Sequence, residues 1–509
     1  MKSAFFRTYQ PDNLKYLGTP GKVYNRLTLH SGDYEMGLLT EKDDGEKSLS
    51  DLTSYYCMIK NIDYFETLLL GDYNIEFGEG LALWSSYGGM KSSYINSVGK
   101  SGRNIIAKRG NEENKFFRGI AFSSNIWKLR VSGYYSRNKF DAVVNNSSGL
   151  ITSFAETGYH RTSAEIKNAD SGEEIFIGGR ADFAIDSLLN LGLLVYNSKF
   201  IPALKLDNAG PAVGQFRMSS LSYKLFFGYY TLSGEIARYG GGFSFISSVS
   251  GFIGNAAGFI FSLRSYQNGS SSPHSFPLAE NYGRADNEFG FYSAFSYKAS
   301  FGRFIIYHDR YSPKEFSDLK TMLYNGNETS LGFESKISRE IDCGIRLRIE
   351  TKENHSGNIQ NAEERSIFGF VTDLSYNLSR EIKLKSWLSY SNYAETNTHE
   401  NGFAVYQDIR YSGKRFFISA RATVFQSSSY LCRIYEYEND IPGLANRASL
   451  SGQGVKFYFI TAYKFRPILT ISLKYWMMFN NKSVSGTVDT GDISLNENKK
   501  LSLQFEILL

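Results

Sequence analysis

The chain has 509 residues, of which 16% are aromatic and 21% are charged, and its formal net charge is +5. So small an excess of charge, spread over the whole chain, excludes the clustered basic surface of a nucleic-acid-binding protein. The three cysteines, Cys57, Cys343 and Cys432, are far apart and odd in number, which excludes a disulfide framework and a cysteine metal site. We expect them to be ordinary strand residues.

The residue usage favours β-structure. Tyr and Phe, which favour strands, number 36 and 39, and Gly is common at 47, whereas Pro, which removes ladder hydrogen bonds, is rare at 9. Mean hydropathy is −0.31, too low for membrane helices, but a transmembrane barrel alternates apolar and polar residues and keeps a modest average. The one long uncharged stretch, residues 241–263, is rich in Gly and Ser. It predicts two strands that meet near Gly254 and Asn255.

Residues 1–22 have no apolar run of the length that a secretion signal needs. We expect this segment to be the remnant of a truncated upstream region. The rest, residues 23–509, is expected to be a single barrel domain, with a plug or a long loop at residues 74–115.

The segment TEKDDGEKS, residues 40–48, gathers acids around a glycine: Glu41, Asp43, Asp44 and Glu46. Such oxygen ligands could hold Ca²⁺, but the spaced ligand loop of an EF-hand is missing. Asp44 and Gly45 form a hairpin-turn dipeptide, and we favour a turn with solvated charges and no metal.

The segment GDYNIEFGEGLALW contains Gly71, Gly78 and Gly80 and invites comparison with phosphate-binding loops. It lacks the Lys-Ser/Thr ending of such a loop, and no clear helix follows it. We favour a structural role, in which the glycines let a strand bend or let the segment pass through the barrel interior.

Hairpin patterns recur along the chain. Apolar and polar residues alternate on both sides of short turns near Asn125, Ser300, Ser338 to Ile341, Ser379-Arg380, Gly413 and Pro467. Long polar connections lie between them, at residues 138–159, 197–214, 267–287, 353–365 and 480–498. This layout predicts an all-β fold, a large closed antiparallel transmembrane β-barrel of roughly 22–26 strands, with short turns at one end and long polar loops at the other.

One strand shows the two faces clearly. In IDCGIRLRIE, residues 341–350, the apolar residues share one face, and the charged residues Asp342, Arg346, Arg348 and Glu350 share the other. Lys383 and Lys385 take the same place in a later strand. These lumen-facing charges would set ion selectivity in a pore, or form salt bridges that fill the interior, and their mixed signs favour salt bridges. Trp127, Trp387 and Trp476 fit an aromatic girdle at the membrane interface.

A surface hydrolase would need a catalytic base, and the sequence has six histidines. The best candidate among them is His308, which is followed by Asp309 at a strand end. No Gly-x-Ser-x-Gly elbow accompanies the pair, and adjacent strand residues point apart. We therefore predict no enzyme activity, no cofactor and no metal site.

The last strand is the most specific signal. Leu501, Leu503, Phe505, Ile507 and Leu509 alternate up to the carboxyl terminus. Such a strand closes a barrel against the first strand and removes an edge that lipid cannot satisfy. It also predicts that the barrel-assembly machinery of the cell is a partner.

Several segments together resemble a known family. KYLGTPGKVYNRL (residues 15–27), LLLGDYNIEFGEGLALW (68–84), FFRGIAF (116–122) and RIYEYENDIPG (433–443) with GQGVKFYF after it are similar to barrel regions of Bacteroidetes-type proteins named for a helix-hairpin-helix domain. The resemblance implies a DNA-binding-type segment before the barrel, and no such helical pair is visible in this sequence. A nucleic-acid partner is therefore expected only through a missing amino-terminal domain.

The sequence thus predicts a non-catalytic barrel embedded in outer-membrane lipid, acting as a channel or a translocation component. The alternative is a structural or binding barrel that anchors a periplasmic DNA-binding or partner domain.

Overall fold

The computed structural model describes residues 2–9, 16–84, 91, 98–100, 102–205, 212–269, 271–280, 284–315, 325–355, 362–442, 444, 446–465, 468–481 and 495–508. Within these ranges no helix has the length and apolar character that crossing a bilayer requires. The one helix with printed bounds, α2 (Ser163–Asn168), is short and lies in a connection.

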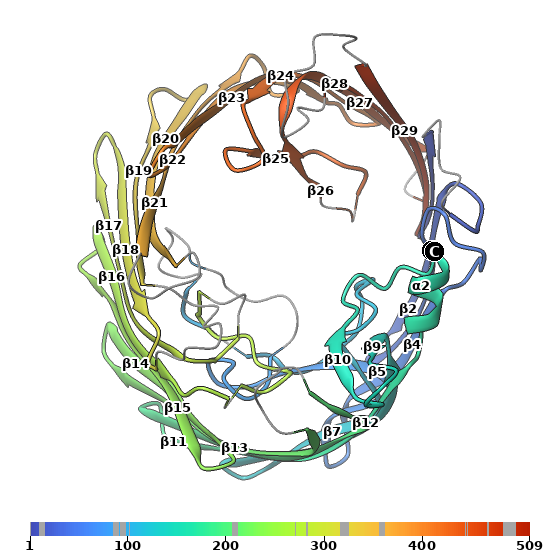
Figure 1. Cartoon of the computed structure of the whole chain (residues 1–509), viewed down its shortest axis with the longest axis vertical. Helices are drawn as coiled ribbons and strands as arrows, with labels where there is room; N and C mark the ends of the chain where they lie inside the picture. Colours follow the sequence, from blue (N-terminus) through green and yellow to red (C-terminus); the bar gives the residue numbers. More distant parts are fainter. Residues whose placement is uncertain are drawn as a thin grey trace.

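The fold is a 27-stranded sheet together with a small two-stranded sheet. Figure 1 shows the large sheet curved into a ring that surrounds an interior. Three of its strands, β6, β9 and β10, are short pieces inside the ring, which leaves 24 long strands as the wall. Each wall strand pairs antiparallel with the next one along the chain, as the hairpin pattern predicts, and 24 falls within the expected range.

The wall strands of the first half are β1 (Lys2–Tyr9), β2 (Lys22–Ser31), β3 (Tyr34–Lys42), β4 (Leu52–Ile62), β5 (Phe65–Glu76), β7 (Phe117–Ile126), β8 (Leu129–Phe140), β11 (Gly172–Ile185), β12 (Leu189–Leu204), β13 (Val213–Phe227), β14 (Tyr230–Tyr239) and β15 (Gly242–Ile253). Those of the second half are β16 (Ala257–Tyr266), β17 (Glu288–Ala299), β18 (Gly302–Ser312), β19 (Gly326–Lys336), β20 (Ile341–His355), β21 (Ala362–Asn377), β22 (Ile382–Glu395), β23 (Thr398–Ser412), β24 (Phe416–Ser427), β27 (Gly452–Phe465), β28 (Leu469–Asn481) and β29 (Leu495–Ile507). The short strands are β6 (Asn104–Ala107), β9 (Ala142–Val144), β10 (Ile151–Phe154), β25 (Ile434–Glu438) and β26 (Asn446–Leu450).

Side chains alternate between the two faces of the wall. Every wall strand from β2 to β29 exposes at least one large apolar or aromatic side chain, such as Leu193 on β12, Ile306 on β18 and Val405 on β23. The neighbouring positions are buried and often polar, with serines and charged residues on strand after strand. The outer face therefore exposes apolar side chains, and the inner face carries the buried serines and charged residues.

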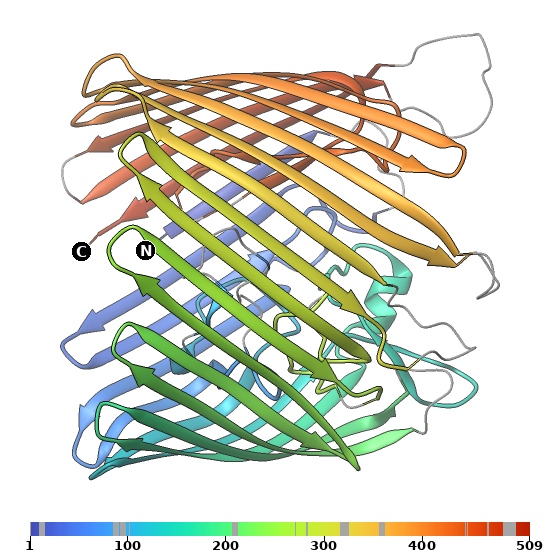
Figure 2. The ribbon, with the colours of Figure 1, turned by 90° about the vertical axis from the view of Figure 1, so that its left-hand side faces the viewer.

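The two ends of the ring differ. Consecutive wall strands join through short turns at one end, where the chain termini also lie, and mostly through long connections at the other (Figure 2). The expected turns near Asn125, Gly254, Ser300, Ser338, Ser379 and Gly413 all lie at the short-turn end. Two connections at the loop end, β14–β15 and β22–β23, are tight as well. The predicted layout is confirmed, whereas Pro467 lies outside the described residues.

The amino-terminal expectation differs from the structure. Instead of preceding the sheet, Lys2–Tyr9 forms β1, which pairs with β2 on one side and with β29 on the other. The sequence of this strand is short and has no regular alternation, so the local pattern does not predict it. Its position follows from hydrogen bonding to the backbone groups of β2 and β29.

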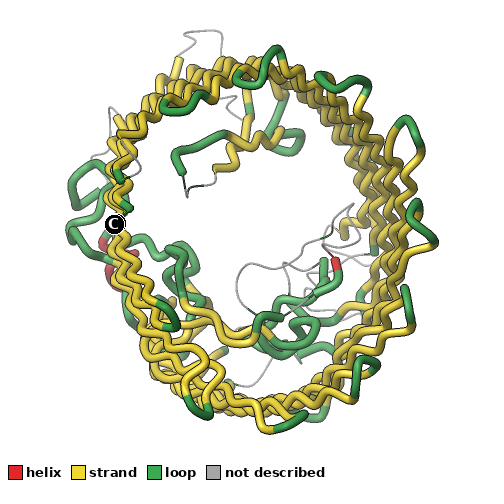
Figure 3. The backbone as a smooth tube through the Cα atoms, turned by 180° about the vertical axis from the view of Figure 1, so that it is seen from behind, coloured by secondary structure: helices red, strands yellow, loops and turns green. Residues whose placement is uncertain are grey.

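The interior is partly filled by the chain's own connections. Figure 3 shows the β25–β26 hairpin and the connections after β5, β8 and β16 reaching into the ring. A large cluster of buried side chains lies between these connections and the inner faces of the first-half strands. The described part of residues 74–115 contributes to it through Phe77, Leu81, Ala82 and Leu83, each at most 1% exposed. Two smaller clusters lie beneath the hairpin.

Candidate functional site

The interior of the ring is the candidate site, and its first element is a pair of connections held against the wall. We call residues 77–84, after β5, and residues 271–280, after β16, the inner loop pair. The backbone N–H of Phe276 donates to the Gly80 oxygen at 2.8 Å, and that of Trp84 to the His274 oxygen at 3.0 Å. The two segments therefore form one unit, although they are far apart in the sequence.

Glu235 anchors this unit. The side chain projects inward from the middle of β14 and is 0% exposed. Its carboxylate accepts hydrogen bonds from the backbone N–H groups of Glu79 (2.7 Å), Leu81 (3.0 Å) and Ala82 (3.1 Å), and from the Ser220 hydroxyl at 2.6 Å. Buried carboxylates need such donors, so the wall and the inner loop pair satisfy one another.

The glycines of this segment allow the cradle to form. Gly78 and Gly80 adopt φ of +52° and +84°, a region that residues with a Cβ rarely visit. A Cβ on Gly78 would lie 2.6 Å from Glu235 Oε2. The backbone amides thus form an anion-binding site, and the carboxylate of Glu235 occupies it. This geometry agrees with the prediction that the glycines have a structural role and do not form a phosphate-binding loop. Gly71, at φ +103°, lies where β5 approaches the Tyr55 carbonyl.

A second anchor is a buried network around Arg264 of β16. Its guanidinium is 0% exposed and binds both oxygens of Asp309, at 2.7 and 3.1 Å, and Glu288 at 2.5 Å. Lys91, from the connection after β5, adds a contact to Asp309 at 2.7 Å. Glu280 of the inner loop pair is bound by Lys91 and by Lys352 of β20.

The predicted lumen charges join this network in part. Arg348 contacts Glu328 at 2.9 Å and Glu350 at 2.5 Å, and Lys352 contacts Glu350 at 2.8 Å. In the next hairpin Lys385 lies 3.3 Å from Asp373. These contacts fit the salt-bridge interpretation. Asp342, Arg346 and Lys383 lie on the same inner face, and the structure does not bring them into one site.

The third element is the β25–β26 hairpin, which lies against the opposite part of the wall. Three cations project inward from the wall: Arg421 of β24, Lys456 of β27 and Lys474 of β28. The hairpin presents carboxylates to them, and Lys456 contacts Glu436 at 2.5 Å and Glu438 at 2.7 Å. The side chains of Lys456, Glu436 and Glu438 are all fully buried, so opposite charges hold the hairpin in place.

Further contacts complete this anchor. Arg421 binds Asp408 of β23 at 2.7 Å and Glu436 at 2.8 Å, and Lys474 lies 2.9 Å from Asp440. Trp476 Nε1 donates to Glu438 at 3.0 Å. Because the partners sit at mid-strand positions, the hairpin lies deep in the ring and not at its rim.

Two of the three tryptophan predictions are wrong. Trp476 faces inward to Glu438, and Trp387 stacks on Tyr406 with ring centroids 4.9 Å apart on the inner face. An indole N–H needs a partner when buried, and the hairpin supplies one that the local pattern does not show. Trp127, in a turn at the short-turn end, is 85% exposed. Cys432 also differs from expectation, because it lies buried in a turn before β25 and not in a strand.

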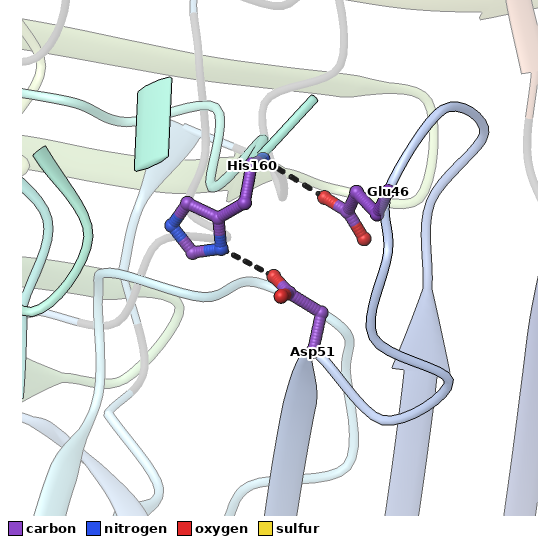
Figure 4. Close-up of side chains that lie close together, drawn as sticks. All are labelled: Glu46, Asp51 and His160. Atoms are coloured by element: carbon purple, nitrogen blue, oxygen red, sulfur yellow. Dashed lines mark hydrogen bonds and ion pairs between the residues drawn. The ribbon is translucent and has the colours of Figure 1, made fainter. Parts of the chain in front are cut away.

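The loop end of the ring contains a second candidate, a histidine between carboxylates (Figure 4). The backbone N–H of His160 donates to Glu46 at 3.0 Å, its Nδ1 contacts Asp51, and its Nε2 lies 3.1 Å from Asp141. Hydrogen bonds to Asp141 and Asp51 raise the pKa of His160 to about 10. The imidazolium therefore joins the connections after β3, β8 and β10.

This cluster has a metal-like composition, since ligand atoms of Glu46, Asp51 and His160 all lie within 4.8 Å of one another. A metal ion needs a neutral imidazole nitrogen, but both ring nitrogens of His160 already face carboxylates. Burial raises the pKa of the nearby Glu113 to about 9, with further contributions from Glu46 and Asp43. Glu46, Asp51, Asp141 and a protonated His160 therefore join three connections by hydrogen bonds, and we call these four residues the His160 junction.

The acidic run at residues 40–48 is not a solvated turn, so that interpretation is wrong. Glu41 and Glu46 are each 1% exposed. Lys22 contacts Glu41, and lies 2.7 Å from Asp43. The Asp44 carboxylate accepts from the Gly21 N–H. The connection folds back on β2 and buries its charges against partners from distant segments, which a local turn pattern does not reveal. The Ca²⁺ ligands that we considered are thus engaged with protein groups.

His308 and Asp309 do not form a catalytic pair. Asp309 points inward to Arg264, whereas His308 points outward, with its Nδ1 2.8 Å from Thr329 Oγ1. An outward groove of about 890 Å³ includes His308 together with Arg310, Asn327 and Glu353 near the loop end.

The carboxyl-terminal strand pairs on both sides. β29 matches β28, and it matches β1 with Lys2 opposite Glu506 and Tyr9 opposite Lys499. Leu501 and Phe505 are 45% and 41% exposed, and Ser502 and Gln504 are buried on the inner face. Leu509 lies outside the described residues.

Sequence reasoning did not single out Glu235, Arg264 or the Arg421 group. The available signal was a charge among apolar and small residues of a strand: Arg264 is the one charge in AGFIFSLRSY, and Glu235 lies in YTLSGEIARY with Arg238 as the other charge. A charge in that position needs a buried partner.

No family model matches the sequence, and no curated protein matches it. Solved structures with similarity include the copper transporter OprC, at 9% identity and a TM-score of 0.45, covering 99% of this chain and 80% of that chain. The siderophore receptor PirA from Pseudomonas aeruginosa matches at 7% identity and a TM-score of 0.42, covering 100% and 80%. OccAB3 from Acinetobacter baumannii matches at 9% identity and a TM-score of 0.32, covering 74% and 97%. These identities are too low to transfer a ligand from any of the three.

Proposed function

We propose that the chain is a closed transmembrane β-barrel of a bacterial outer membrane, and that its interior conducts small polar solutes. The observation that carries this proposal is the exposed apolar side chain on every wall strand from β2 to β29. An apolar band of this extent is unfavourable in water, where soluble monomers keep exposed patches small. Lipid is the solvent that fits it.

Closure is supported by the pairing of β1 with both β2 and β29. With this pairing every wall strand has a hydrogen-bonded neighbour on each side. An open edge inside a bilayer would leave backbone groups unsatisfied, at a cost of several kcal/mol for each group. Both termini lie at the short-turn end, which we assign to the periplasm, because long loops face the exterior in such barrels.

Conduction is supported by the arrangement of the interior. The inner loop pair is anchored to β14 and the hairpin to β23, β24, β27 and β28, on different parts of the wall. The hairpin side chains that alternate with the buried acids are open to solvent, with Tyr435 38% and Tyr437 72% exposed. A ring of 24 strands is wider than the barrels of 16–18 strands that leave an aqueous channel.

The test is conductance of the purified, folded chain in planar bilayers, with a heat-dependent gel shift as the check of folding. We expect stable single-channel steps. A second variant replaces residues 428–451 by a Gly-Ser turn, which is feasible because Ser427 pairs directly with Gly452. Its steps should be larger, because the hairpin no longer occupies the interior.

The matched control replaces the exposed turn residues 396–397, between β22 and β23, by the same Gly-Ser pair. This turn lies outside the interior, so the steps should be unchanged. A folded barrel that never conducts in any of the three forms would contradict the proposal and leave the alternative, a barrel that anchors a periplasmic domain. The family resemblance stays a prediction.

A further inference from the structure

The β25–β26 hairpin has two chemically different faces. Along β25, Ile434, Glu436 and Glu438 are buried against the wall, whereas Tyr435 and Tyr437 between them are 38% and 72% exposed. The acids of the buried face are used by Arg421, Lys456 and Lys474. The exposed face has no such role in holding the hairpin, which lies inside the ring (Figure 1).

The exposed face alternates arginines with tyrosine rings. The guanidinium of Arg447, on β26, lies 4.0 Å from the ring centre of Tyr435 and 5.5 Å from that of Tyr437. The guanidinium of Arg433 lies 4.1 Å from the ring of Tyr430. Two guanidinium groups and three rings therefore form one continuous surface, which we call the Arg-Tyr face: Tyr430, Arg433, Tyr435, Tyr437 and Arg447.

The arginines are positioned but not neutralised. Arg433 Nε donates to the Tyr435 hydroxyl at 2.7 Å, and its Nη1 donates to the Tyr430 carbonyl at 2.8 Å. Elsewhere on the hairpin every buried acid has a basic partner. In the part of the chain that the structure describes, no carboxylate forms a salt bridge with Arg433 or Arg447. Among the described residues, these two guanidinium groups therefore have tyrosine partners and no carboxylate partner.

The chemistry of this face selects a class of ligand. A guanidinium binds a carboxylate through two parallel N–H groups, with more geometric specificity than a lysine. A flat ring packs on an exposed tyrosine, and Tyr437 offers most of its surface next to Arg447. A solute that combines a ring with a carboxylate uses both elements at once.

We propose that the Arg-Tyr face binds small organic anions that carry a carboxylate on a ring, and that it selects them as they enter the interior. The selection of solutes rests on the proposed function, because it requires that the interior conducts. The binding of these anions does not require conduction. The ring can be that of a sugar acid or of an aromatic acid. Two probes, glucuronate and benzoate, distinguish these sources, and glucose and acetate each lack one of the two elements.

Binding is measured by saturation-transfer NMR and calorimetry on the whole folded chain in detergent micelles. We expect glucuronate or benzoate, or both, to bind at least tenfold more tightly than glucose and acetate. The double variant R433Q/R447Q should lose at least tenfold in affinity for the carboxylates. The lysine variant R433K/R447K should retain part of it, because charge remains while the paired N–H geometry is lost.

The control is Arg346→Gln, which removes an exposed arginine from the inner face of β20, away from the hairpin. It should bind all probes as the wild type does, and an unchanged gel shift shows that each variant folds. If glucuronate binds no more tightly than glucose and benzoate no more tightly than acetate, or if R433Q/R447Q binds the carboxylates as tightly as the wild type, the proposal is overturned. A barrel that binds carboxylates but never conducts would contradict the proposed function alone.

Discussion

The carboxylate oxygen Oε2 of Glu235 lies 2.7 Å from the backbone nitrogen of Glu79, although 156 residues separate them in the chain. This contact joins the middle of a wall strand to a connection that could otherwise extend into solvent. Two more amides and a serine hydroxyl share the same carboxylate. The attachment of this connection to the wall therefore involves one buried acid, which a substitution can test.

Glu235→Ala should release the inner loop pair. Three amides lose their acceptor, and hydrogen bonds to charged groups contribute about 1.5–3 kcal/mol each. We expect faster hydrogen exchange at residues 77–84 and cleavage there by added protease, while the wall stays intact. Glu235→Gln, which keeps one acceptor oxygen, should show a smaller effect. Glu173→Gln is the control, because Glu173 pairs with an exposed arginine on the rim. Equal protection in wild type and Glu235→Ala would show that other contacts hold the segment.

Lys456→Met should destabilise the folded chain by about 3–5 kcal/mol, because it removes the one cation shared by Glu436 and Glu438 and leaves these buried carboxylates with only Arg421 and Lys474 as cationic partners. Adding Glu438→Gln should recover part of this loss, since the pair is coupled. Urea unfolding in lipid vesicles measures both. Lys128→Met, which breaks an exposed pair with Asp186, should cost no more than about 1 kcal/mol. A double variant whose loss equals the sum of the two single losses would contradict the coupling.

The adjacent residues His308 and Asp309 should respond very differently to substitution. Asp309→Ala leaves Arg264 buried without its bidentate partner, and we expect a loss of about 3–5 kcal/mol. His308→Ala removes one hydrogen bond to Thr329 and should cost about 0.5–1.5 kcal/mol. Unfolding of both variants in parallel is the measurement. A peptidase or lipase activity that disappears in His308→Ala would instead revive the hydrolase hypothesis.

The junction at His160 should loosen at alkaline pH. The pKa of His160 is raised to about 10 by hydrogen bonds to Asp141 and Asp51, so its contribution is complete below about pH 6.5 and is lost as the pH rises through about 10. The pKa of Glu113 is raised to about 9 by burial, and its contribution is likewise lost as the pH rises from about 4.5 toward 9. Both groups therefore act in the same direction.

Proteolysis of the connections after β3 and β8 at pH 6, 8 and 10 measures this effect. We expect cleavage to increase with pH in the wild type. His160→Gln, which forms hydrogen bonds but carries no charge, should be cleaved readily at pH 6 and should change less between pH 6 and 10. Cleavage that stays constant from pH 6 to 10 in the wild type would show that the junction does not depend on this proton.

The sequence by itself determined the wall of this protein. A period of two in side-chain polarity is a local property, and so are the turn residues that punctuate it, so strands such as Ile341–His355 and their hairpin partners follow from the chain without tertiary information. The alternation also separates an apolar face from a polar face. This pattern predicted that Leu501 and Phe505 lie on the outer face of the sheet. It also predicted that Arg348 and Glu350 lie on the inner face.

Only the tertiary structure decided what fills the interior. Glu235 meets Glu79, and Lys456 meets Glu438, because curvature of the sheet brings together residues that no local pattern relates. Distant partners also bury Glu41 and Glu46 of the acidic run. Trp476 likewise binds Glu438 on the inner face and does not take its predicted place at a membrane interface. The physical reason is that a buried charge or indole N–H is placed by its partner, and these partners are brought together by the packing of distant segments and not by spacing along the chain.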